Sequence, residues 1–291
     1  MGWSDGYWTS SDDVRLHYRD YAGRADRPPI LCIPGLTRNA RDWEGVAERL
    51  AGERRLICVD LRGRGESGHA HDSSTYVPGT YVADLEALIA ELRLNRFVLF
   101  GTSLGGLITM LLSVRHRDRI AGALLNDIGP VVEAQGIAFI LSYVGRPQNW
   151  PTWLHASRSL GEAQSERYPD WGLDQWLVFA KRTCRLTATG RVVLDYDMRI
   201  ADPFLDPASH VATDLWDAFA GLRDIPTLLL RGELSDLLAP ATVERMRTEN
   251  SALEAVTIPR VGHAPTLDEP ESQAAIDALL ARIETAEKMP A

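Results

Sequence analysis

The sequence predicts an α/β fold, in which a mostly parallel sheet carries helices on both faces and is interrupted by one long insertion. Short apolar segments such as 30–33 and 96–100 are typical of strands that are buried on both faces. They alternate with amphipathic segments such as 80–94, in which the apolar residues recur at helical spacing. A regular alternation of strand and helix is the pattern of a parallel sheet with helical crossovers.

The remaining elements follow from the same two patterns. Segment 7–21 alternates apolar and polar residues, which predicts a hairpin whose second arm places His17 on the exposed face. The expected buried strands are 30–33, 54–63, 96–100, 120–126, 226–233 and 253–259. The expected helices are 43–50, 80–94, 104–112, 241–248 and a last one that carries Ile276, Leu279, Leu280 and Ile283.

The insertion is predicted where this alternation stops. Residues 131–212 contain no clear buried strand and are rich in aromatic residues. We therefore expect a core made of residues 1–130 and 213–291, with a mostly helical cap at 131–212. Aromatic side chains in a cap suit an apolar pocket, so Trp150 and Trp153 are candidate pocket residues. The alternative interpretation is that they pack a small core within the cap.

Composition narrows the class of protein. The net charge of −9 opposes binding to the phosphates of nucleic acid, and no apolar run approaches the length of a membrane helix. The first 20 residues are polar and acidic, unlike a secretory signal, and three cysteines without metal spacing favour a reducing compartment. We therefore expect a cytoplasmic protein whose partner is a small molecule, with neither nucleic acid nor membrane involved.

The motif that carries chemistry lies at residues 101–105, which read Gly-Thr-Ser-Leu-Gly and match G-x-S-x-G. A buried strand runs directly into the motif, and a buried helix is expected to follow it. In this context the serine occupies a tight strand-to-helix turn that lifts its hydroxyl above the sheet edge, beside the N–H groups of the helix N-terminus. Ser103 is therefore the candidate nucleophile.

A serine hydroxyl needs a base, and the base needs an acid to orient it. His263 follows the strand at 253–259 and is the candidate base. Asp236, which follows the strand at 226–233, is the preferred acid, because strand ends of a parallel sheet meet at one edge. Asp127 also follows a strand and is the alternative acid, and Glu233 is a third candidate.

These features together resemble the α/β-hydrolase superfamily over nearly the whole chain. The matching residues are Pro34-Gly35-Leu36 with Trp43 downstream, Asp60 to Ser67, Gly101 to Gly105, Asp236 and Gly262-His263. The resemblance implies the α/β-hydrolase fold, a Ser–Asp–His triad, a helical cap and no metal or organic cofactor. It also implies an oxyanion hole formed by the backbone N–H groups of Leu36 and Leu104.

A serine at the nucleophile position reduces the number of reaction types that the resemblance implies. Relatives that cleave haloalkanes or epoxides use aspartate at this position, whereas a serine forms an acyl-enzyme. We therefore expect hydrolysis of a carboxylic ester, thioester or lactone of a small, largely apolar substrate. Carbon–carbon bond hydrolysis of ring-cleavage products, and a small-molecule receptor that retains the triad, are the alternatives. Thr37 and Arg38 are possible pocket residues, although Arg38 is expected mainly at the surface.

Overall fold

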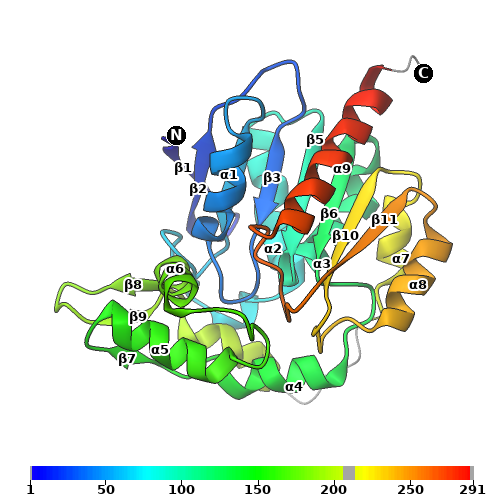
Figure 1. Cartoon of the computed structure of the whole chain (residues 1–291). Coiled ribbons are helices and arrows are strands. Elements are labelled where there is room, and N and C mark those ends of the chain that lie inside the picture. The colour runs from blue at the N-terminus through cyan, green and yellow to red at the C-terminus, as the bar shows by residue number, and fades with distance from the viewer. Residues whose placement is uncertain (1, 206–213, 289–291) are drawn as a thin grey trace.

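The computed structural model describes residues 2–205 and 214–288. Within them, eight strands form one sheet in the order β1-β2-β4-β3-β5-β6-β10-β11 (Figure 1). All neighbouring pairs are parallel except β1 with β2 and β2 with β4. The strands are β1 (Ser4–Thr9), β2 (Arg15–Tyr21), β3 (Ile30–Ile33), β4 (Leu56–Asp60), β5 (Phe97–Thr102), β6 (Ile120–Asn126), β10 (Thr227–Gly232) and β11 (Leu253–Ile258). The predicted fold class is confirmed.

Helices cover both faces of this sheet. They are α1 (Glu44–Leu50), α2 (Pro78–Glu91), α3 (Leu104–His116), α7 (Trp216–Phe219), α8 (Pro240–Glu249) and α9 (Pro270–Lys288). Adjacent residues of β5 serve opposite faces, as the pleat requires. Leu99 packs with α2 and α3, whereas Phe100 packs with α1 and α9. None of the helices in the described ranges is long and apolar enough to cross a membrane.

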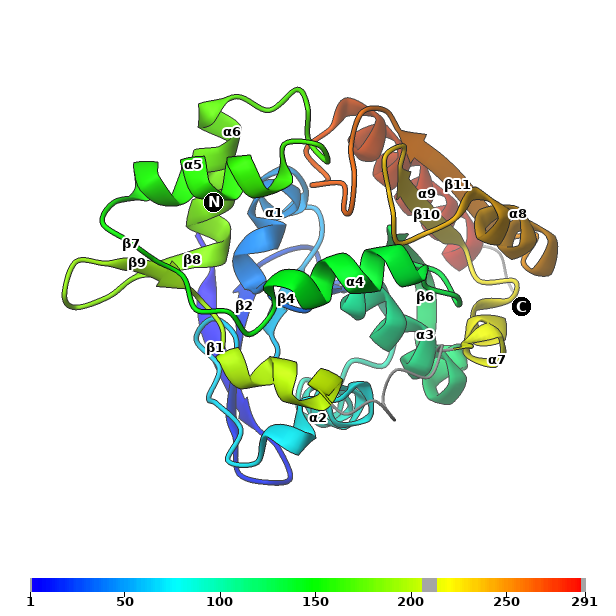
Figure 2. The ribbon, with the colours of Figure 1, turned by 90° about the horizontal axis from the view of Figure 1, so that it is seen from below.

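Residues 131–205, which follow β6, lie across the carboxyl ends of the parallel strands, as Figures 1 and 2 show from two directions. We call these residues the insert. Its elements are α4 (Ala134–Tyr143), β7 (Asn149–Trp150), α5 (Trp153–Gln164), α6 (Leu173–Thr183), β8 (Cys184–Leu186), β9 (Val192–Leu194) and the 3₁₀ helix η4 (Met198–Leu205). The predicted boundary at 212 lies outside the described residues.

The insert contains a feature that the sequence pattern did not predict, a small antiparallel sheet of order β7-β9-β8. Its strands are two or three residues long, too short to show an alternating pattern. Each contributes one buried side chain, Trp150, Cys184 or Val192, to a separate small core under α5 and α6. The insert is therefore stabilised partly by its own apolar contacts.

His17 corrects one expectation about the first hairpin. The residue is 1% exposed rather than on the surface. Its Nδ1 lies 2.7 Å from Asp60 Oδ2 and its Nε2 lies 3.0 Å from Asp5 Oδ1. The alternation correctly predicted that His17 points to the other face of β2 from Leu16 and Tyr18. The loop after β4 covers the face that carries His17, so both faces of the strand are buried there. Burial alone would lower the pKa of His17, yet the two carboxylates outweigh it and raise the pKa above its usual value.

The turn between β5 and α3 is packed against backbone on both sides. A Cβ on Gly101 would lie 2.3 Å from the carbonyl oxygen of Gly105, and a Cβ on Gly105 would lie 2.0 Å from that of Ile33. Backbone atoms cannot move aside as the end of a side chain can. Only glycine fits at these two positions, which explains the spacing of the motif.

Gly101→Ala should therefore lower the free energy of unfolding by about 1–3 kcal/mol, as overpacking of a dense interior typically does. Gly79→Ala is the matched control, because its Cβ would meet no atom within 4 Å in the first turn of α2. That substitution should be neutral or stabilise by about 0.4–1 kcal/mol. Urea unfolding followed by circular dichroism measures both, and equal effects at the two positions would contradict this account of the turn.

Candidate active site

Ser103 occupies the turn that the motif predicted. Its backbone has φ +52° and ψ −116°, a conformation that a residue with a side chain rarely adopts. The turn is held by a hydrogen bond from Ser103 N to the carbonyl oxygen of Asn126, at 3.0 Å. Ser103 immediately precedes α3, so its hydroxyl stands at the N-terminus of that helix, where the first backbone N–H groups lack intrahelical partners.

His263 follows β11 and contacts Ser103 directly. Its Nε2 lies 2.8 Å from Ser103 Oγ, and its Nδ1 lies 2.7 Å from Asp127 Oδ2. A carboxylate oxygen accepts hydrogen bonds, so Nδ1 carries the proton that it donates to Asp127. Nε2 is then free to accept the hydroxyl proton of Ser103, which is the arrangement of a general base beside a nucleophile.

Asp127 therefore occupies the place that the sequence assigned to Asp236, and that preference was wrong. Asp127 is fully buried directly after β6. Its Oδ1 accepts a hydrogen bond from Gly232 N at 2.9 Å, and its Oδ2 accepts one from Ser235 Oγ at 2.6 Å. The loop after β10, which was expected to supply the acid, instead supplies hydrogen-bond donors to it.

Asp236 has a different partner, because its side chain turns toward the insert and pairs with Arg167. Both side chains are largely buried, 14% and 16% exposed. The contact joins residues 69 apart in the chain, so no local pattern revealed it. Glu233, the third candidate acid, accepts a hydrogen bond from Arg260 N at 2.7 Å and does not contact His263.

The insert also holds the loop that carries His263. Gly262 N donates to the carbonyl oxygen of Arg167 at 2.7 Å. Tyr168 Oη donates to the carbonyl oxygen of Ala264 at 2.9 Å. Burial raises the pKa of Tyr168, so its hydroxyl keeps the proton that it donates. Two consecutive residues of the insert therefore bond to the residues on either side of His263.

A cavity of about 420 Å³ opens above Ser103 between the core and the insert. This volume lies in the range of small-molecule sites. Much of its wall is apolar and comes from the insert, through Phe139, Ile140, Tyr143, Trp150, Leu160, Tyr168, Phe179, Leu194 and Tyr196. Ser103 and His263 both line the cavity, so a bound molecule can contact both side chains.

The loop after β3 runs beside Ser103, where the expected oxyanion hole would lie. A Cβ on Gly35 would lie 3.7 Å from Ser103 Cβ, and Leu36 lines the cavity. The buried Arg64 donates from Nε to the carbonyl oxygen of Leu36 at 2.8 Å. Leu104 is the first residue of α3, directly after Ser103. Leu104 therefore directly follows Ser103, Leu36 directly follows the glycine beside Ser103, and Arg64 holds the backbone of Leu36.

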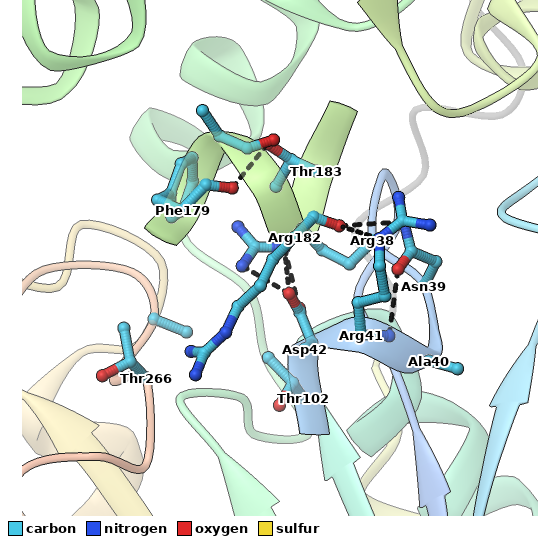
Figure 3. A network of polar contacts seen from close by, with 12 residues as sticks. Arg38, Asn39, Ala40, Arg41, Asp42, Thr102, Phe179, Arg182, Thr183 and Thr266 are labelled. Carbon is cyan, nitrogen blue, oxygen red and sulfur yellow. Dashed lines mark hydrogen bonds and ion pairs between the residues drawn. The ribbon is translucent and has the colours of Figure 1, made fainter. Parts of the chain in front are cut away.

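Of the four residues predicted as possible pocket residues, three line the cavity and one does not. Thr37, Arg38 and Trp150 line the cavity, but Trp153 does not and packs in the small core of the insert. Arg38 is therefore not simply a surface residue. Its guanidinium bonds both carboxylate oxygens of Asp42 and lies 4.3 Å from the ring centre of Phe179 (Figure 3). Burial lowers the pKa of Arg38, but the charge of Asp42 outweighs it and the net shift is upward.

The fold and this site define the class of protein. A family model described as the alpha/beta hydrolase family matches residues 30–276. The chain belongs to this family, as the resemblance predicted.

Two curated relatives and one solved structure show how the chain stands within the family. It is 52% identical to an alpha/beta hydrolase of Novosphingobium aromaticivorans, whose crystal structure superposes with a TM-score of 0.93 over 97% of this chain and 99% of that one. It is 34% identical to a 3-hydroxybutyrate-oligomer hydrolase of Cupriavidus necator, over 88% of this chain and 89% of the relative. It is 28% identical to the mouse sn-1-specific diacylglycerol lipase ABHD11, over 88% and 81% of the two chains. These relatives are hydrolases.

The buried ion pair between Arg167 and Asp236 should contribute measurably to stability. Arg167→Met leaves the largely buried Asp236 carboxylate without a partner, which should cost about 1.5–3 kcal/mol in free energy of unfolding. Arg260→Met is the matched control, because its pair with Asp170 also joins the insert to the core but is about 60% exposed on both sides. Exposed pairs contribute little, so the control should unfold at the wild-type urea concentration. Equal midpoints for the two variants would contradict this difference.

Proposed function

We propose that the protein is a serine esterase in which Ser103, His263 and Asp127 form the catalytic triad. The observation that carries the proposal is the continuous hydrogen-bond relay from Ser103 Oγ through His263 to Asp127, at the floor of the cavity. A hydroxyl on this relay is an activated nucleophile. The insert acts as a cap that encloses the substrate over the relay, and no metal or organic cofactor takes part.

The reaction follows from the positions of these groups. Ser103 Oγ attacks the ester carbonyl carbon while His263 Nε2 takes the hydroxyl proton. The backbone N–H groups of Leu36 and Leu104 stabilise the negative oxygen of the tetrahedral intermediate. His263 then returns the proton to the leaving alcohol, which departs and leaves an acyl-enzyme. Water, deprotonated by His263, hydrolyses this ester and releases the acid.

The substrate class that we propose is a short ester of a hydroxy acid. The curated relative at 34% identity, over most of both chains, is a 3-hydroxybutyrate-oligomer hydrolase. A cavity of about 420 Å³ suits a molecule of a few such units better than a long polymer chain. Its apolar wall matches the short alkyl side groups, and the polar side chains of Thr102 and Thr266 at its floor match the ester oxygens.

The nucleophile is tested by covalent labelling. Ser103→Ala should abolish labelling by a fluorophosphonate and lower the turnover of p-nitrophenyl butyrate by about 10⁶-fold, as in other serine hydrolases. The folded state should persist, because only one oxygen atom is removed. Labelling of the variant at the wild-type rate would refute the assignment of Ser103.

The choice of acid is tested by two isosteric variants. Asp127→Asn should lower kcat by about 10⁴-fold, because an amide cannot hold the imidazole in the required tautomer. Asp236→Asn should keep turnover close to the wild-type value, since Asp236 bonds Arg167 rather than His263. The measurement is kcat at saturating p-nitrophenyl butyrate, with unfolding curves to confirm that both variants are folded. The reverse order of the two effects would restore the assignment to Asp236.

A substrate panel separates the ester reaction from the two alternatives. The wild-type protein should turn over esters of graded acyl length and a 3-hydroxybutyrate dimer continuously, and should leave a vinylogous 1,5-diketone intact. Preferential cleavage of the diketone would favour carbon–carbon hydrolysis. A single burst equal to the amount of protein, with no further turnover, would favour a receptor.

A further inference from the structure

Arg182, at the end of α6, is a cation built into the wall of the cavity. Its backbone is fixed from the core, because its carbonyl oxygen accepts hydrogen bonds from Asn39 Nδ2 at 3.1 Å and Arg41 Nε at 3.2 Å. Its side chain extends from α6 toward the loop of Thr266 (Figure 3). The position of the guanidinium is therefore set from both the insert and the core.

The charge of Arg182 is less well balanced than that of the other arginine in the cavity. Arg38 is bonded to both carboxylate oxygens of Asp42, which also lines the cavity. Arg182 has one ion pair, from Nη1 to Asp268 Oδ2 at 2.9 Å, and Asp268 is 42% exposed and lies outside the cavity wall. Among the described residues, the cavity wall therefore holds two arginines and one carboxylate, in a chain whose net charge is −9.

Arg182 also has an unused hydrogen-bond donor. Its side chain is only 11% exposed, and its buried Nε has no hydrogen-bond partner within the described residues. A buried N–H group without a partner is costly and uncommon in native proteins. A guanidinium in the wall of a cavity is suited to an anionic ligand, because its planar fork of donors matches the two oxygens of a carboxylate.

We propose that Arg182 binds the free carboxylate of the substrate, so that the enzyme prefers esters that carry a terminal carboxylic acid. The inference rests on the proposed esterase function and adds a specificity-determining residue to it. An oligomer of a hydroxy acid has one such terminus. With the carboxylate held by Arg182 and an ester carbonyl at Ser103, the cut falls at a fixed distance from the acid end of the chain.

The test compares one substrate in two charge states. The linear dimer of 3-hydroxybutyrate is assayed as the free acid and as its methyl ester, which blocks the terminal carboxylate. In the wild-type protein kcat/KM should be higher for the free acid. Arg182→Met should lower the ratio of the two kcat/KM values by roughly 10-fold to 100-fold, the usual effect of a lost charged hydrogen bond. Arg182→Lys keeps the charge without the planar fork and should give an intermediate ratio.

Arg158→Met is the matched control, since Arg158 is an exposed arginine of α5 outside the cavity wall, and its ratio should equal that of the wild type. Binding provides a second measurement. In the Ser103→Ala background, calorimetry should detect tighter binding of the free-acid dimer than of its methyl ester, and Arg182→Met should remove the difference. This comparison does not depend on turnover.

Two failures are distinguishable. If the wild type cleaves both forms of the dimer equally well, or if the ratio is unchanged in Arg182→Met, the carboxylate site is refuted while the esterase assignment stands. If neither form of the dimer nor any p-nitrophenyl ester is hydrolysed in a Ser103-dependent manner, the esterase function itself is refuted, and the role of Arg182 with it.

Discussion

The geometry of the site depends on the close backbone packing around the turn at Ser103. Gly101 and Gly105 allow the end of β5 and the start of α3 to approach each other and the carbonyl oxygen of Ile33. This approach forces Ser103 into its unusual backbone conformation and directs its hydroxyl into the cavity. It also brings the loop after β3, which carries Leu36, beside Ser103. Strain at one residue is sustained here by dense packing on both sides.

The insert contributes to the site as well as covering it. Arg167 and Tyr168 bond to the residues on either side of His263, so the position of the imidazole depends on a segment nearly 100 residues earlier in the chain. Asn126 adds a core contact to the same loop, since its Nδ2 donates to the carbonyl oxygen of Pro265 at 2.8 Å. The relay from Ser103 to Asp127 is thus held by both parts of the molecule, and its geometry is coupled to the docking of the insert.

The carboxylate partners of the buried arginine Arg62 differ from the partner of the cavity arginine Arg182. The buried Arg62 is bonded to the carboxylates of Asp12 and Asp84, which neutralise it. Such pairs brace loops and leave no donor directed at a ligand. In the cavity, Arg182 pairs with Asp268, a carboxylate that is 42% exposed and lies outside the cavity wall. An acidic protein can bind an anionic substrate in this way, because a nearby positive charge in a buried site interacts with the anion more strongly than the distant charges that make up the net charge.

The sequence by itself determined the α/β fold and the insertion and singled out Ser103 and His263, which the structure brings into contact, because each of these inferences rests on a local signal. Apolar periodicity marks the strands and helices, and the motif around Ser103 is contiguous. Only the tertiary structure decided between Asp127 and Asp236, since both follow strands that end at the same edge of the sheet. The physical reason is that Arg167, 69 residues before Asp236 in the chain, forms an ion pair with the Asp236 carboxylate. Gly232 and Ser235 instead donate hydrogen bonds to the carboxylate of Asp127. The burial of His17, the displacement of Trp153 from the cavity and the position of Arg182 were likewise decided by contacts between segments far apart in the chain.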